Sequence, residues 1–199
     1  MTKELKQFLQ DNRSLIEREQ FYELYMKLGN TIGKKNSTYT PELTEFLINC
    51  DMDPLDYLPS VPIGYMKCSS LLDHIRIPDH IEMVNRAAFI CSDLKTVTFG
   101  EMSKCTHIMD YAFKGSERLE SVILPKTCSH IGTDAFRNCD WLETVVIPTV
   151  DPKTYIEDEA FAYCPYLTIY CNPGPVENYC IEHKLNYKLL TENKRTKIR

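Results

Sequence analysis

The chain has 199 residues, of which 43% are hydrophobic and 26% are charged, and its formal net charge is −5. These values are typical of a folded globular protein and exclude an extensively disordered one. Residues 61–172 carry 10 basic and 15 acidic side chains. We therefore expect no direct nucleic-acid binding, because that needs clustered Lys and Arg.

Residues 1–60 are predicted to form a small helical region. Helical spacing of apolar residues, a Ser-x-x-Glu capping box and an N-cap followed by proline predict three helices, over about 5–12, 14–30 and 41–49. The two prolines of the connector 51–59 limit it to a turn or a short 3₁₀ segment. At the other end of the chain, the basic residues of 191–199 are interpreted as a solvated tail.

Between residues 64 and 172 the pair Ala-Phe returns four times, with phenylalanines 24, 23 and 25 residues apart. A fixed period of this size indicates a stacked repeat architecture. The four rings are those of Phe89, Phe113, Phe136 and Phe161, and Met66 takes the phenylalanine place in an incomplete first copy. One coil cannot bury this column alone, whereas stacked coils enclose a continuous core.

Each coil is predicted to contribute one short strand to a parallel sheet. Apolar residues stand nine and eleven positions after the phenylalanine, as in Val145 and Ile147, and this alternation is typical of a strand with one buried face. The connections that follow the strands differ in length. Residues 99–108 and 147–156 span nine steps each, against seven for 124–131. Longer loops in a regular solenoid are candidate contact points as well as tolerated insertions.

These repeating positions resemble the BspA-like leucine-rich repeat family, and the best match runs from Leu124 through Ala135-Phe136 and Cys139 to Pro148. The resemblance covers about residues 64–190 and implies an α+β fold. We expect a leucine-rich-repeat solenoid of about five coils with a short parallel sheet over residues 61–190. A capping segment over 175–184 and the helical region 1–60 complete the predicted organisation.

The resemblance also implies a non-enzymatic protein–protein interaction module, and we look for its contact residues at the outward positions. On the strand face these are Arg76, Thr98, Ser121, Ile123, Thr144, Val146 and Ile169. A second surface column, six positions before the phenylalanine, holds His107, His130 and Tyr155. The strand face covers only ~240 Å², against ~800 Å² per partner in a standard interface, so loops or residues 1–60 must contribute to tight binding.

Chemistry at a Cys-His constellation is an alternative interpretation. Cys105 with His107, and Cys128 with His130, occupy the same positions in consecutive coils, and two Cys with two His can form a tetrahedral zinc site. Against this, the cysteine column continues as Ile81, which predicts buried packing residues. We therefore expect no metal, no cofactor and no catalytic residue.

The apolar segments and the cysteines of the sequence predict the compartment of the protein and the kind of partner it binds. The N-terminal segment lacks an apolar core of roughly 7–15 residues, as a secretory signal would have, and no apolar run approaches ~20 residues. The nine cysteines are an odd number and several recur at one repeat position, which favours packing over disulfides. We expect a cytoplasmic protein that binds another protein and no membrane. An acidic inhibitor or decoy that blocks a nucleic-acid-handling enzyme is the alternative within binding.

Overall fold

The computed structural model describes residues 54–56, 60–61, 63–70 and 72–190. The three helices predicted before residue 50 and the basic tail 191–199 lie outside the described residues. Within the connector, the described residues form η2 (Pro54–Asp56), a single turn of 3₁₀ helix, which agrees with the prediction at these three residues.

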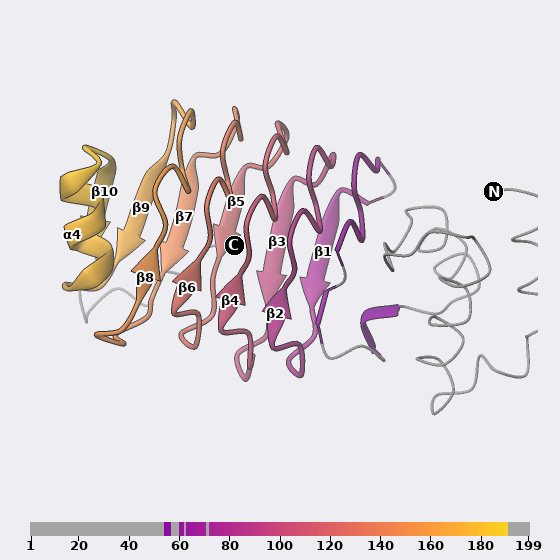
Figure 1. The fold of residues 1–199 in the computed structure, drawn as a ribbon, viewed down its shortest axis with the longest axis horizontal. Coiled ribbons are helices and arrows are strands. Elements are labelled where there is room, and N and C mark those ends of the chain that lie inside the picture. Colours follow the sequence, from indigo (N-terminus) through magenta and orange to yellow (C-terminus); the bar gives the residue numbers. More distant parts are fainter. Residues whose placement is uncertain (1–53, 57–59, 62, 71, 191–199) are drawn as a thin grey trace, which may run out of the picture.

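The described chain is a solenoid that passes in turn through two parallel sheets (Figure 1). The six strands of the larger sheet are, in spatial order, β1 (His74–Ile77), β3 (Thr96–Phe99), β5 (Ser121–Ile123), β7 (Thr144–Ile147), β9 (Thr168–Cys171) and β10 (Asn186–Leu189). The smaller sheet has four: β2 (Met83–Val84), β4 (His107–Ile108), β6 (His130–Ile131) and β8 (Tyr155–Ile156).

A full turn crosses both sheets, so the described part holds about four turns, preceded by an incomplete one that contains β1. The sequence predicted about five. It also predicted a single sheet, which is wrong. The second sheet was missed because its strands have two residues each, too few for any alternation of apolar and polar side chains to be recognised.

The core lies between the two sheets and is organised around the repeating phenylalanines. Their rings stack nearly parallel, with centroids 5.0, 5.0 and 5.1 Å apart from Phe89 to Phe161. Met66 is fully buried at the equivalent place in the first turn. Tyr65 meets Phe89 edge-on at 5.9 Å and ends the column there. The predicted aromatic column is confirmed.

A polar column inside the core links each turn to the one before it. Three residues after the phenylalanine, a serine hydroxyl or a cysteine thiol donates a hydrogen bond to the phenylalanine carbonyl of the preceding turn. The bonds run from Ser116 to Phe89 (2.7 Å), from Cys139 to Phe113 (3.2 Å) and from Cys164 to Phe136 (3.1 Å). These recurring residues are therefore hydrogen-bonded packing residues.

The corner around each phenylalanine uses two left-handed backbone positions, one two residues before the ring and one two residues after it. The first set has φ between 54° and 62° and comprises Ala87, Tyr111, Asp134 and Glu159. The second has φ between 52° and 67° and comprises Cys68, Cys91, Gly115, Asn138 and Tyr163. Only glycine adopts this conformation without cost, so the corner stores strain in most turns.

The predicted capping segment is a helix, α4 (Pro175–Glu182), which packs on the last turn (Figure 1). It buries Val176, Tyr179 and Cys180, and the Tyr179 ring lies 6.4 Å from Phe161 at the end of the aromatic column. Ile181, on the same helix, is 58% exposed. No helix in the described ranges has the length and apolar character that crossing a membrane requires.

Candidate functional site

The outward side chains of the larger sheet form two columns that run across the strands. Ser121 stands between Thr96 and Thr144 in one column, and Ile123 is in register with Val146 in the other. Six of the predicted contact residues lie on this face: Arg76, Thr98, Ser121, Ile123, Thr144 and Val146. Ile123 is the most exposed aliphatic among them, at 42%. The face exists as predicted from β1 to β7.

The prediction for Ile169 is wrong, because this side chain is fully buried and in register with Val145. Two steps separate Leu167 from Ile169, whereas three separate Leu142 from Val145. A shift of one residue sends every side chain of a strand to the opposite face. Consequently the apolar patch on Ile123 and Val146 continues into Tyr170, the partner of Val146 in β9.

The second predicted set forms a ladder of rings on the smaller sheet. His107, His130 and Tyr155 are in register on β4, β6 and β8, with ring centroids 5.4 and 6.2 Å apart. Tyr155 is 57% exposed, and the His107 ring is held by the Thr106 hydroxyl at 2.7 Å. The two sheets enclose the core, so this ladder and the strand face point in different directions. The predicted contact residues are thus divided between two surfaces.

The Cys-His constellation does not come together as one site. The Cys105 and Cys128 thiols are buried, and the imidazoles of His107 and His130 lie on the surface. Burial raises the pKa of Cys105 to about 11 and that of Cys128 to about 12, so both thiols stay protonated at neutral pH, whereas a nucleophile needs the thiolate. Across the described ranges, no group of three or more His, Cys, Asp or Glu side chains is placed to hold a metal ion.

A groove of about 680 Å³ opens at the corner where β3, β5 and β7 end. It is lined by residues 99–102, residues 123–126 and Pro148. The unequal loops explain it, since the short connection after β5 lies between two connections that are two residues longer. Met102, on the first long loop, is 79% exposed. Ile123 belongs both to the groove and to the strand face, so the two are continuous.

Several exposed residues that could contact a partner were missed at the level of sequence. Met102 and Lys126 lie on loops whose shape only the fold defines. Trp141 and Tyr166 are 62% and 65% exposed, and both stand five residues after the phenylalanine in consecutive turns. The sequence could have shown this, because Trp141, the only tryptophan of the chain, and Tyr166 occupy the same position in consecutive repeats. Large exposed aromatics of this kind are enriched at protein interfaces.

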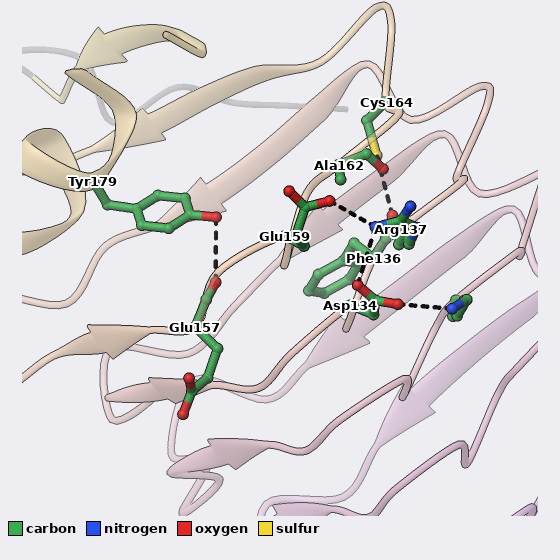
Figure 2. A network of polar contacts seen from close by, with 9 residues as sticks. Asp134, Phe136, Arg137, Glu157, Glu159, Ala162, Cys164 and Tyr179 are labelled. Atoms are coloured by element: carbon green, nitrogen blue, oxygen red, sulfur yellow. Dashed lines mark hydrogen bonds and ion pairs between the residues drawn. The ribbon is translucent and has the colours of Figure 1, made fainter. Parts of the chain in front are cut away.

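A charged network joins three consecutive turns (Figure 2). Asp134 accepts hydrogen bonds from Lys114 at 2.7 Å and from Arg137 at 3.4 Å, and Arg137 also reaches Glu159 at 2.6 Å. The Arg137 guanidinium lies 4.5 Å from the Tyr163 ring centroid. Both carboxylates stand at left-handed corner positions, so the same arginine anchors two strained corners and holds an exposed tyrosine ring.

Comparison with known proteins agrees with this architecture. A family model described as "BspA type Leucine rich repeat region" matches residues 64–168, in six copies. No curated protein matches the chain. The crystal structure of the pneumococcal vaccine antigen PcpA is similar over 68% of this chain and 47% of its own, with 12% sequence identity and a TM-score of 0.38. This chain therefore spans about half the length of that one. The family match covers more than half of the sequence, and the chain belongs to the BspA-type leucine-rich repeat family.

Proposed function

We propose that this protein is a non-enzymatic interaction module that binds another protein through the groove and the adjoining strand face. The observation that carries the proposal is the apolar rim of the groove. Met102 and Ile123, both among the lining residues, project into solvent there. Contiguous exposed apolar side chains around a depression are typical of interaction sites. Repeat modules of this kind generally mediate protein–protein contacts.

The shape and charge of the groove favour an extended segment of the partner with a large apolar side chain. A volume of about 680 Å³ accommodates such a side chain and its neighbours. Glu101 and Lys126 lie on neighbouring loops of the lining, so charged groups of both signs stand beside the apolar side chains of the groove. Because the groove continues into the face at Ile123, the same segment can extend across β5 and β7. This adds the area that the strand face alone lacks.

Ile123→Asp tests this surface, and Leu189→Asp is the matched control. Both side chains are 42% exposed and lie near the end of a strand of the larger sheet, but Leu189 is on β10, away from the groove. The full-length chain is immobilised and exposed to lysate of the native host. We expect the protein retained by the wild type to be retained by Leu189→Asp and reduced at least ~10-fold by Ile123→Asp. Equal retention by the two folded variants would refute the assignment.

A decoy function is the second candidate, and an acidic cluster favours it. Glu117 and Glu120 lie beside Asp140 and Glu143 of the next turn, because the Trp141 and Glu143 amides donate to the Glu117 and Glu120 carbonyls at 3.2 and 3.0 Å. All four carboxylates are exposed. Such a cluster is complementary to the basic site of a nucleic-acid-handling enzyme.

Salt dependence distinguishes the decoy from the groove. For a decoy, retention of the partner falls steeply as salt rises, and the double variant Glu120→Gln/Glu143→Gln weakens it. For binding in the groove, the double variant leaves retention unchanged and only Ile123→Asp reduces it. Circular dichroism of each variant establishes that the repeat remains folded.

A further inference from the structure

The cysteines of the described chain occur as neighbours. Each of the eight stands next to another: Cys68 with Cys91, Cys105 with Cys128, Cys139 with Cys164, and Cys171 with Cys180. All eight are free thiols. Three pairs contain buried cysteines and belong to the core. Cys68 and Cys91 are the exposed pair among the described residues.

The backbone holds these two residues in the same place on consecutive turns. Each lies two residues after the column position, and each has a left-handed backbone, with φ of 52° and 53°. The Cys68 amide donates to the Ile90 carbonyl at 2.8 Å, and the Cys91 amide donates to the Lys114 carbonyl at the same distance. Adjacent turns are about 5 Å apart, within the ~4.4–6.8 Å between Cα atoms that a disulfide spans.

The two thiols are also close enough to influence each other. Burial, followed by the neighbouring Cys68 thiol, raises the pKa of Cys91. On its other side Cys91 faces Gly115, the next residue of the column, where a Cβ would stand 3.1 Å from the Cys91 sulfur. Since glycine has no side chain, no Cβ at this position crowds the Cys91 sulfur.

We propose that Cys68 and Cys91 form a dithiol site that closes to a disulfide by exchange with a low-molecular-weight disulfide such as oxidised glutathione. The thiolate of one cysteine attacks a glutathione sulfur, which forms a mixed disulfide and releases one glutathione thiolate. The thiolate of the second cysteine then attacks the protein sulfur of the mixed disulfide and releases the second glutathione. Two protein thiols are oxidised, and one glutathione disulfide is reduced to two thiols.

Closure joins the incomplete first turn to the second. Each turn of a solenoid is held by its immediate neighbours, and separating two turns breaks the contacts between them. A covalent link across residues 69–90 prevents that separation. In the reducing cytoplasm that we propose from the sequence the site is open, and in an oxidising environment it is closed.

The experiment uses the full-length chain with Cys50→Ser, which removes the ninth cysteine, lying outside the described residues. The reduced protein is incubated with oxidised glutathione under native conditions, denatured in the presence of an alkylating agent, and mapped by mass spectrometry. Trypsin separates the two cysteines into peptides 68–76 and 87–95. We expect these peptides linked, an intact mass lower by two hydrogens before alkylation, and release by dithiothreitol.

Two controls make the result specific. In Cys91→Ser, the same treatment is expected to leave a stable glutathione adduct on Cys68, because the resolving thiol is missing. Cys139 and Cys164, adjacent but in the core, are expected to be alkylated as free thiols. Separate glutathione adducts on Cys68 and Cys91 without a link, no reaction at either, or a link to any other cysteine would each overturn the proposal.

Discussion

Phe136 is in the middle of the aromatic column, with Phe113 on one side at 5.0 Å and Phe161 on the other at 5.1 Å. Phe136→Ala removes a fully buried ring from the stack, and the neighbouring turns are fixed by backbone bonds that prevent collapse into the cavity. We expect the free energy of unfolding to fall by ~3–5 kcal/mol, measured by urea denaturation. Trp141→Ala, at a 62% exposed ring, is the control and should change it by only a few tenths of a kcal/mol. A loss below ~1 kcal/mol for Phe136→Ala would contradict a packed column.

The strain of the corners is testable at Ala87, whose φ is 54° and whose side chain is only a methyl group. Ala87→Gly keeps the backbone conformation and removes the close approach of Cβ to the following carbonyl oxygen. We therefore expect the free energy of unfolding to rise by ~0.5–1 kcal/mol. The comparison is Ala112→Gly, where the alanine is fully buried and the left-handed conformation is absent. There the same change should lower the free energy of unfolding. We therefore expect the two variants to change this free energy in opposite directions, measured by thermal or urea unfolding. A change in the same direction for both would show that the corner is not strained.

At the scale of the strand, the first two strands of the larger sheet are linked by an ion pair between Asp73 and Lys95, 3.0 Å long. The hydrogen bond from Lys95, followed by its charge, lowers the pKa of Asp73 below the ordinary 3.8. A lowered pKa in the folded state means that the pair stabilises the fold above about pH 3.8 and that this contribution disappears as pH falls through the folded-state pKa.

Lys95→Met removes the ammonium and keeps most of the side chain, so the Asp73 pKa should move back toward 3.8. Titration of the carboxyl carbon by NMR measures this directly. Lys104→Met, at an exposed lysine outside this pair, should leave Asp73 unchanged. An Asp73 pKa that did not respond to Lys95→Met would mean that the ion pair does not form in solution.

The strands also show which outward residues could be predicted from the sequence. Counting from the phenylalanine placed the outward residues of β1 to β7 correctly, because the spacing from leucine to strand is constant there. It failed at β9, where one missing residue before Ile169 exchanged the faces. A deletion can be seen in the sequence, but the register that resolves it comes from pairing with Thr144 and Val145.

The candidate site was less predictable than the fold, for a physical reason. Ile123 could be found from its repeat position, and the two long loops were identified by counting. The groove arises only when residues 99–102, residues 123–126 and Pro148 come together from three turns. The sequence of a single loop does not show that the loop in the adjacent turn is shorter, and the groove depends on that difference.

At the scale of the whole molecule, the C-terminal cap protects the open end of the stack. α4 covers the aromatic column at Tyr179, and β10 pairs with β9. Truncation after residue 173 would expose the edge of β9 and the Phe161 ring, and an uncovered edge of a parallel sheet pairs with other chains. We expect this variant to have a higher molar mass than the full-length chain by light scattering. The chain ending at residue 190, which keeps the cap, should match the full-length chain, and equal masses for all three would contradict a protective role.

The parallel stacking has a mechanical consequence. Hydrogen bonds between turns run along the direction in which the turns stack, and the residues of β1 and of β10 lie at opposite ends of the larger sheet (Figure 1). A pulling force applied between those residues therefore acts along these bonds and loads the turns in series. Each turn is held by its immediate neighbours alone, so the chain yields one turn at a time at low force. The molecule behaves as an extensible spring, whereas a sheet sheared along its strands resists as a single unit.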